Sequence, residues 1–423
     1  MYDTSEDFKK ETAILAAVDT GEYNCEVSIA ELEELCETAD IEVVGIVTQK
    51  RPNPDPATAL GEGRILELKE LVEKLDSTMI IFDSELSPAQ IKNIEDTCDC
   101  PVIDRTMLIL NIFSRHAVTS EGKLQVELAN LRYQLPRLFG KGVQMSRLGG
   151  GGAGGGGARR GAGETKAELD RRHIKKRIEA LQDELKEVAK RRQMIRGRRK
   201  KDNVITVAIV GYTNVGKSTL LNHLTEAGVL AENKLFATLD PTSRALTLPD
   251  GREVMLVDTV GLVRRLPHHL VEAFKSTLEE ATEADLILNI CDISDPEVEE
   301  KREVTINMLR DMGAENVPVV TVYNKCDMLD SEPLLIGSDV LISAKTGRNI
   351  DKLLLAIENA LPKSHTRVKI IIPYTDSGIE SKLLQNGKVY TREYLNEGVE
   401  IDANIDNKNL YLIKKEWISP LNS

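Results

Sequence analysis

The first hundred residues alternate short apolar runs with stretches of helical periodicity. "IEVVGIV" at 41–47 and "TMIIF" at 78–82 are apolar runs of strand length, and "ILELKELVEKL" at 65–75 repeats its apolar residues at helical spacing. Strands that alternate with helices are typical of an α/β domain. The pattern therefore predicts a small N-terminal α/β domain over residues 1–116.

The pattern over residues 117–201 predicts two helices packed as an antiparallel hairpin. Each helix carries apolar residues spaced 4, 3, 4, 3, a narrow seam that suits helix–helix packing. The two seams are Leu124, Leu128, Leu131, Leu135 and Leu138, then Ile174, Ile178, Leu181, Leu185 and Val188. Pro136 should kink or end the first helix nearby, because proline lacks the amide hydrogen that a helix interior needs.

A glycine-rich segment separates the two helices. Ten of the fifteen residues from Gly149 to Gly163 are glycine, and Phe139 to Gly163 contains no Asp or Glu but several Lys and Arg. A backbone without side chains can approach another surface closely. We expect residues 139–165 to form a basic tip of the hairpin that contacts RNA, with a slack linker as the alternative.

The rest of the chain alternates strand-like and helix-like segments again. Residues 202–362 predict a larger α/β domain. Residues 363–423 predict a small C-terminal α/β domain, with strands near "RVKIII" (367–372) and "LYLIKKEW" (410–417).

The charge of the chain is unevenly distributed. The net charge of −13 argues against nucleic acid as a partner, yet residues 159–201 hold 17 Lys and Arg against 7 Asp and Glu. That segment carries +10 and leaves −23 on the remainder. A charge run is often a solvated helix face, but a basic segment on an acidic body can also bind phosphate locally.

The cysteine content and the absence of long apolar runs indicate the compartment in which the protein works. The six cysteines are scattered, and although "CDCP" at 98–101 suggests a metal site, no second Cys or His pair stands at zinc-site spacing, so we expect reduced thiols. No apolar run approaches the ~20 residues that span a bilayer. The N-terminus has no apolar signal-peptide core. We therefore expect a cytoplasmic protein without stable membrane insertion.

A phosphate-binding loop is the first motif that carries chemistry. "VAIVGYTNVGKST" at 207–219 contains Gly211, four residues, then Gly216, Lys217 and Ser218, between an apolar strand and a helix. Glycines let backbone amides curl around phosphate oxygens, and the helix N-terminus adds a positive dipole. Lys217 should reach the β- and γ-phosphates, and the Ser218 hydroxyl should ligate Mg²⁺.

Three further motifs follow in the order typical of a GTP-binding domain. "VMLVDTVG" ends with Asp258, which can hold Mg²⁺ through water, and Gly261, whose amide can sense the γ-phosphate. "VVTVYNKCD" supplies Asp327, which can accept hydrogen bonds from guanine N1–H and the 2-amino group, donors that adenine lacks. The backbone of Ser343, Ala344 and Lys345 in "LISAKTG" can contact guanine O6. The predicted fold is a P-loop GTPase domain with a doubly wound, mostly parallel sheet.

The residues expected to carry out hydrolysis are less clearly marked in the sequence than those expected to bind the nucleotide. "NKLFATLDPTSR" at 233–244 stands where a mobile switch should ligate Mg²⁺, with Thr238 and Thr242 as candidates. Leu262 occupies the place where many GTPases carry a water-orienting glutamine, which indicates slow intrinsic turnover. Asn214 is a candidate for holding a monovalent cation such as K⁺. Arg264, Arg265, His268 and His269 are more typical of surface residues than of catalytic groups.

These motifs resemble the HflX family of translation-associated GTPases over nearly the whole chain. The segments that carry the resemblance are 86–95, 102–110, 121–132, "GAGETKAELDRR" at 161–172, "LFATLDPTSR" at 235–244 and "DTVGLVRRLPHHLVEAFKSTLEE" at 258–280. The match makes Thr238 the Mg²⁺ ligand of the first switch. In that family an apolar residue such as Leu262 usually replaces the glutamine. The glycine run here is longer than the family pattern, and "GAGETK" stands where "GPGETQ" is common.

The resemblance implies a set of nucleotide-site residues. The proposed catalytic residues are Lys217, Thr238 and Gly261, and the proposed Mg²⁺ ligands are Ser218, Thr238 and Asp258. The full set expected around GTP or GDP is Gly211, Tyr212, Thr213, Asn214, Val215, Gly216, Lys217, Ser218, Thr219, Phe236, Ala237, Thr238, Leu239, Asp240, Asp258, Thr259, Val260, Gly261, Asn324, Lys325, Cys326, Asp327, Ser343, Ala344 and Lys345.

The resemblance also implies a function. It implies binding to the large ribosomal subunit and its rRNA, and GTP-dependent splitting or rescue of ribosomes with hydrolysis stimulated by that partner. We expect a monomer that binds no DNA. Two alternatives stay open: a GTPase of ribosome assembly or RNA modification that uses the basic hairpin, and a weakly hydrolysing GTP-dependent scaffold, which Leu262 would suit.

Overall fold

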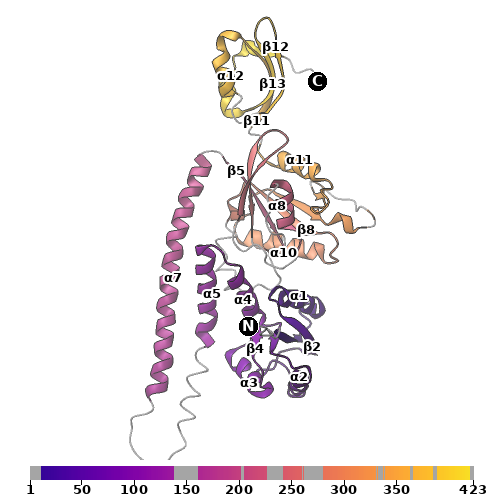
Figure 1. The fold of residues 1–423 in the computed structure, drawn as a ribbon, viewed down its shortest axis with the longest axis vertical. Helices are drawn as coiled ribbons and strands as arrows, with labels where there is room; N and C mark the ends of the chain where they lie inside the picture. The colour runs from indigo at the N-terminus through magenta and orange to yellow at the C-terminus, as the bar shows by residue number, and fades with distance from the viewer. Residues whose placement is uncertain are drawn as a thin grey trace, which may run out of the picture. The chain divides into compact units, whose positions relative to one another are not determined.

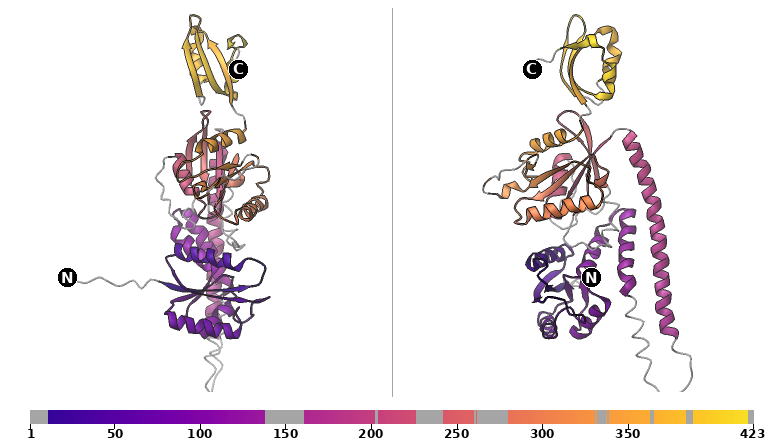
Figure 2. Two further views of the ribbon diagram at one scale, coloured as in Figure 1. Left: turned by 90° about the vertical axis from the view of Figure 1, so that its right-hand side faces the viewer. Right: turned by 180° about the vertical axis from the view of Figure 1, so that it is seen from behind.

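The computed structural model describes most of the chain, which forms two compact units. The described residues up to Met194 form one unit, and those from Ile195 onward form the other. The first unit contains one sheet and the second contains two (Figures 1 and 2). The described ranges are 11–137, 161–201, 204–225, 242–259, 261, 280–329, 331, 337, 339–362, 365–383 and 388–419.

The first unit contains a four-stranded parallel sheet with strand order β2-β1-β3-β4. Its strands are β1 (Thr12–Asp19), β2 (Glu42–Lys50), β3 (Met79–Phe82) and β4 (Val102–Asp104), which alternate with α1 (Cys25–Thr38), α2 (Glu62–Leu75), α3 (Pro88–Cys98) and α4 (Arg105–His116). Residues 13–18 of β1 are all buried, as expected of a central strand covered by helices on both faces. The α/β fold predicted for this part is confirmed.

Two long helices, α5 (Ser120–Arg137) and α7 (Gly161–Lys201), lie side by side in the same unit (Figures 1 and 2). Glu127 near the middle of α5 accepts two hydrogen bonds from Arg177, at 2.7 and 2.8 Å. Glu121, at the start of α5, pairs at 2.9 Å with Arg192, which lies further along α7. Early residues of α5 therefore meet late residues of α7, so the helices run antiparallel.

The hairpin differs from the sequence pattern in two details. Only Leu128 of the described leucines in the α5 seam is fully buried, because Val126, Ala129 and Tyr133 are buried as well and broaden the contact face. Leu181 is the fully buried residue of the α7 seam. Residues 161–165, expected in the tip, belong to α7. Leu138 and residues 139–160 of the expected tip lie outside the described residues.

The central sheet has six strands in the order β10-β9-β8-β5-β7-β6. They are β5 (Ile205–Gly211), β6 (Thr242–Thr247), β7 (Glu253–Asp258), β8 (Leu286–Asp292), β9 (Val319–Asn324) and β10 (Val340–Leu341), with helices α8 (Lys217–Thr225), α10 (Val298–Asp311) and α11 (Ile350–Ala360). Every pair is parallel except β6 with β7. This is the predicted doubly wound sheet, and its strand order places β5 at the reversal point where such folds bind ligands.

The C-terminal part forms a four-stranded antiparallel sheet with strand order β12-β13-β11-β14. Its elements are β11 (His365–Ile372), α12 (Ser377–Leu383), β12 (Lys388–Tyr394), β13 (Val399–Asp406) and β14 (Ile418–Ser419). The strand predicted at 410–417 is wrong. Residues 407–412 and 415–417 form 3₁₀ turns. The alternation of a strand is kept from Leu410 to Leu412, with Tyr411 exposed between them, but Ile413 also packs on the core and breaks it.

No helix within the described ranges is both long enough and apolar enough to cross a membrane. The cysteines of the "CDCP" motif, Cys98 and Cys100, are buried, and burial raises the pKa of the Cys98 thiol to about 11. Within the same ranges, no group of three or more His, Cys, Asp and Glu side chains is arranged to hold a metal ion. The described structure therefore favours inert thiols at these two positions.

Candidate nucleotide site

The phosphate-binding loop joins the end of β5 to the start of α8. Gly211 ends the strand with a φ of +149°, and a Cβ atom there would lie 2.3 Å from the carbonyl oxygen of Ile290 on the neighbouring strand. Only glycine allows this close approach and this backbone conformation. Asn214 turns the loop in the left-handed region, with a φ of 61°. Tyr212 and Val215 are buried, Thr213, Ser218 and Thr219 are partly buried, and Asn214 is exposed.

Lys217 lies inside this loop rather than in solvent. Its side chain is 7% exposed, and its ammonium donates hydrogen bonds to the carbonyl oxygens of Gly211 and Tyr212 at 3.1 and 2.6 Å. Burial lowers the pKa of Lys217 to about 8, although the nearby Asp258 carboxylate opposes the shift. The loop therefore holds a cation whose charge an incoming phosphate would stabilise.

We expect the affinity for GDP to fall as the pH rises through about 8. Phosphate oxygens favour the charged lysine and raise its pKa in the complex, so the complex retains a proton that the free protein loses above pH 8. The dissociation constant should rise about fourfold between pH 7.0 and 8.5. Calorimetric titrations with GDP, kept below the pH at which guanine loses its own N1 proton, measure it.

The control for this prediction is Lys217→Arg, because a guanidinium stays charged throughout that range. The arginine variant should bind GDP more weakly but with a flat pH profile. Titrations in two buffers of different ionisation enthalpy should also reveal proton uptake by the wild-type protein near pH 8. A flat wild-type profile without proton uptake would contradict the assignment of this titration to Lys217.

The end of β7 brings the second motif to the same loop. Asp258 is 1% exposed and pairs in register with Ile209 of β5. The Thr259 hydroxyl donates to the carbonyl oxygen of Ile209 at 2.7 Å. A Cβ atom on Gly261 would lie 2.6 Å from Thr213 Cγ2 and 3.1 Å from Lys217 Nζ. The backbone of Gly261 is therefore next to the phosphate loop, as its expected role requires.

Asn324, at the end of β9, joins the third and fourth motifs to the phosphate loop. It is 3% exposed, and its side-chain amide donates to the carbonyl oxygen of Val215 at 2.8 Å. Its side-chain oxygen accepts from the backbone amide of Ala344, also at 2.8 Å. The sequence pattern predicted Asn324 only as a contact of the nucleotide. The structure shows that it bridges two loops that are far apart in the sequence.

Asp327 lies on an exposed turn beside Ser343 and Lys345 of the fourth motif. The hydrogen bond from the Ser343 hydroxyl lowers the pKa of the Asp327 carboxyl, and the positive charges of Lys345 and Lys325 lower it further. Cys326 packs beneath this turn, and its amide donates to the carbonyl oxygen of Ile342 at 3.1 Å. The Asp327 carboxylate is thus charged and accessible, which suits an acceptor of two hydrogen bonds from guanine.

Part of the expected site lies outside the described residues. This holds for Phe236, Ala237, Thr238, Leu239, Asp240 and Val260, and also for Leu262, Arg264, Arg265, His268 and His269. The described residues of all four motifs nevertheless meet at the carboxyl ends of the central strands. Asp292 at the end of β8 also belongs to this edge and was not predicted, because no motif marked it.

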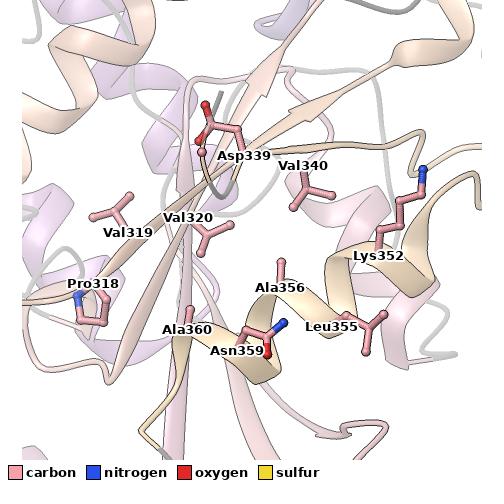
Figure 3. Close-up of a pocket in the computed structure, with 11 residues that line it drawn as sticks. Pro318, Val319, Val320, Asp339, Val340, Lys352, Leu355, Ala356, Asn359 and Ala360 are labelled. Atoms are coloured by element: carbon pink, nitrogen blue, oxygen red, sulfur yellow. The ribbon is translucent and has the colours of Figure 1, made fainter. Parts of the chain in front are cut away.

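A separate pocket of about 560 Å³ lies at the other end of β9. Figure 3 shows Val319 and Val320 of β9 and Leu355, Ala356 and Ala360 of α11 around it. Among the lining residues that the structure describes, Asp339 and Lys352 are the only charged ones, and none of them belongs to the phosphate-binding loop. Because ligands of doubly wound sheets bind at the carboxyl ends of the strands, this pocket is not the nucleotide site.

Three family models match consecutive parts of the chain. Residues 26–114 match "GTP-binding GTPase N-terminal", and residues 116–199 match "GTP-binding GTPase Middle Region". Residues 206–325 match "50S ribosome-binding GTPase". The third match spans the phosphate loop, the Asp258 motif and most of the guanine motif.

Curated relatives extend the match over nearly the whole chain. A protein named GTPase HflX from Caldanaerobacter subterraneus subsp. tengcongensis is 48% identical over 396 residues, which cover 94% of this chain and 91% of the relative. GTPase HflX of Escherichia coli K12 is 42% identical and covers 84% of each chain. A solved GTP-binding protein from Sulfolobus solfataricus, in complex with GDP, is 25% identical with a TM-score of 0.45 and covers 83% of this chain and 98% of its own. From the family models and the curated relatives together, the chain belongs to the HflX family of GTPases, enzymes that bind and hydrolyse GTP.

Proposed function

We propose that GTP binds with its phosphates in the loop from Gly211 to Ser218 and its base against Asp327. The observation that carries this proposal is the Asn324 bridge, which fixes the phosphate loop and the base-binding loop relative to each other. The Lys217 ammonium and the N-terminus of α8 supply positive charge for the β- and γ-phosphates. Gly261 donates its backbone amide to the γ-phosphate.

The described residues fit a Mg²⁺ ion bound together with the nucleotide. Magnesium prefers oxygen ligands and usually completes its shell with water and substrate phosphates. Ser218 on the first turn of α8 and Asp258 at the end of β7 offer a hydroxyl and a carboxylate. We assign Ser218 and Asp258 to Mg²⁺ and keep Thr238 as the third ligand. The ion would neutralise charge that develops on the phosphates during hydrolysis.

Asn214 is our candidate for the monovalent cation site. It is exposed at the outer turn of the phosphate loop, and its left-handed backbone directs the loop around the position of the phosphates. Its side-chain oxygen is a suitable ligand for K⁺. A cation there would add to the positive charge that Lys217 supplies for the phosphates.

The basic hairpin supports a ribosomal role for this GTPase. Arg172, Lys175 and Lys176 are exposed on α7, and the glycine run at 149–163 adds Arg159 and Arg160 to this positive segment of the sequence. Cationic side chains on an extended helix suit contact with the phosphates of RNA. Together with the match to a "50S ribosome-binding GTPase", this supports binding to the large ribosomal subunit and its rRNA. We propose that the protein acts there as a cytoplasmic monomer. There it would split or rescue ribosomes, with slow hydrolysis that the ribosome stimulates.

We propose separate roles for the parts of the chain. Residues 1–116 and the hairpin at 117–201 engage the ribosome, and residues 139–160 are proposed as the tip of the hairpin. Residues 202–362 bind and hydrolyse GTP. Residues 363–423 form the C-terminal sheet, whose Asn404 side chain donates to the carbonyl oxygen of Asp250 at 3.2 Å, in the turn between β6 and β7.

Co-sedimentation with purified large subunits tests the ribosomal role. We expect the protein to pellet with a non-hydrolysable GTP analogue and much less with GDP. Removal of Gly149–Gly163 should weaken pelleting by about an order of magnitude, because the tip would lose several phosphate contacts. A variant that replaces only Arg159 and Arg160 by Gln separates charge from chain length.

Each outcome points to a different function. If pelleting depends on the analogue but is unchanged by the deletion, the ribosomal role stands and the glycine run is a linker. If neither nucleotide supports pelleting, the proposal is wrong, and GTP hydrolysis stimulated by naked precursor RNA would then favour ribosome assembly or RNA modification. Absence of turnover under every condition would leave a GTP-dependent scaffold.

A further inference from the structure

Lys325 of the third motif forms an ion pair with Asp292, a residue that belongs to none of the four motifs. The Lys325 ammonium lies 2.6 Å from Asp292 Oδ2, with the two side chains 28% and 16% exposed. Asp292 is the last residue of β8, and its partner in register is Asn324, the residue just before Lys325. The pair therefore spans two adjacent strand ends, between the phosphate loop and the base-binding turn.

The Asp292 carboxylate is held in one orientation by its own loop. Its Oδ1 atom accepts hydrogen bonds from the Ser294 amide at 3.0 Å and from the Ser294 hydroxyl at 2.6 Å. The Oδ2 atom is left to face Lys325. Since both oxygens have defined partners, the carboxylate presents a fixed negative charge to the lysine.

The backbone of Lys325 is also unusual. Its φ of 66° lies in the left-handed region, which is unfavourable for a residue with a side chain. Strained backbone of this kind persists where the surroundings hold it, and it gathers at functional sites. Here it turns the chain from β9 into the short 3₁₀ helix at Cys326–Met328, which carries Asp327.

We propose that Asp292 is a positioning residue for the guanine base, acting through Lys325. A lysine side chain is a long apolar stem that ends in a charge. With the ammonium anchored at Asp292, the stem is stretched beside Asp327 and forms a wall for one face of the guanine ring. Without the anchor, the ammonium is free to move towards solvent or towards the phosphates, and the wall is lost. The inference rests on the proposed guanine site.

An exposed ion pair alone would not support this role, because such pairs contribute little to stability. The Lys325–Asp292 pair differs because it is partly buried and because Ser294 fixes the carboxylate. Asp295 provides the comparison in the same loop. Its carboxylate pairs with Lys301 of α10 and accepts a hydrogen bond from the Glu297 amide at 2.9 Å.

The test is the dissociation rate of a fluorescent GDP analogue from the full chain. Asp292→Asn should release the nucleotide about tenfold faster, because loss of one member of a desolvated charge pair acts mainly on dissociation. Single-turnover hydrolysis of saturating GTP should keep its rate, since the base is remote from the γ-phosphate. Asp295→Asn, the matched control, should behave as wild type in both measurements.

A double-mutant cycle separates positioning from a general structural effect. Lys325→Met keeps a stem of similar length without the charge, so Asp292→Asn should have no further effect in that background. Ser294→Ala provides a gentler variant that keeps both charges and should accelerate release two- to threefold, about the effect of one lost hydrogen bond.

The outcomes are distinguishable. If wild-type protein binds GDP and Asp292→Asn releases it at the wild-type rate, this inference is wrong and the guanine site stands. Additive effects of Asp292→Asn and Lys325→Met would also overturn it, because Asp292 would then act on something other than Lys325. If wild-type protein failed to bind GDP, the proposed function would fail together with the inference.

Discussion

Asp327→Asn is expected to change the base preference of this enzyme from guanine to xanthine. The Asp327 carboxylate offers two acceptors, which match the N1–H and 2-amino donors of guanine. An amide offers one acceptor and one donor, so its NH₂ group would face the 2-amino group of guanine and leave two donors opposed. Xanthine carries an oxygen in place of that amino group and accepts from the amide. We expect GTP affinity to fall by about three orders of magnitude and affinity for xanthosine triphosphate to rise.

The measurement is competitive binding of GTP and xanthosine triphosphate to both proteins, followed by hydrolysis assays with each. Asp327 is exposed, so the substitution should leave the melting temperature of the nucleotide-free protein unchanged. Asp351→Asn, an exposed carboxylate in the first turn of α11, serves as the control and should keep guanine preference. Unchanged preference for GTP in Asp327→Asn would show that another residue reads the base.

The main features of the nucleotide site could be predicted because its motifs encode local geometry. A glycine-rich turn between an apolar strand and a helix has few conformations, and Gly211 adopts the one expected. Asp258 and Asn324 could be placed because each ends a continuous apolar run, and parallel strands bring such ends to one edge. The alternation of strands and helices predicted a doubly wound, mostly parallel sheet, but it did not predict the strand order or the antiparallel pairing of β6 with β7.

Contacts between distant segments could not be predicted in the same way. The motif "VVTVYNKCD" does not predict that the Asn324 side chain contacts Val215, or that Lys325 pairs with Asp292. The buried face of α5 was wider than its leucine seam because α5 also packs against α4. In the C-terminal part, a short apolar run was compatible with a strand or with 3₁₀ turns, and tertiary packing around Trp417 decided the outcome.

Gly216→Ala should abolish high-affinity nucleotide binding through one of these distant contacts. Gly216 has a φ of +92°, and a Cβ atom there would lie 2.4 Å from Asn324 Nδ2. Asn324 cannot move aside cheaply, because it is buried and hydrogen-bonded to both Val215 and Ala344. The methyl group would therefore break the bridge between the phosphate loop and the base-binding loop. We expect GDP affinity to fall by at least two orders of magnitude and stability by about 2–4 kcal/mol, from backbone strain and two lost hydrogen bonds.

Gly313→Ala separates backbone strain from the loss of the bridge. Gly313 follows α10 with a φ of +88°, but a Cβ atom there would meet nothing within 4 Å. This variant should therefore lose about 1–2 kcal/mol of stability through its backbone alone and bind GDP as wild type does. Chemical denaturation and GDP titration of both variants decide the matter. Equal GDP affinity of Gly216→Ala and Gly313→Ala would mean that the phosphate loop and the base-binding loop keep their positions without the Asn324 bridge. Weak binding by Gly216→Ala alone would mean that nucleotide binding requires the two loops to be held together. The residue that holds them is Asn324, which is 109 residues away from Val215 in the phosphate loop.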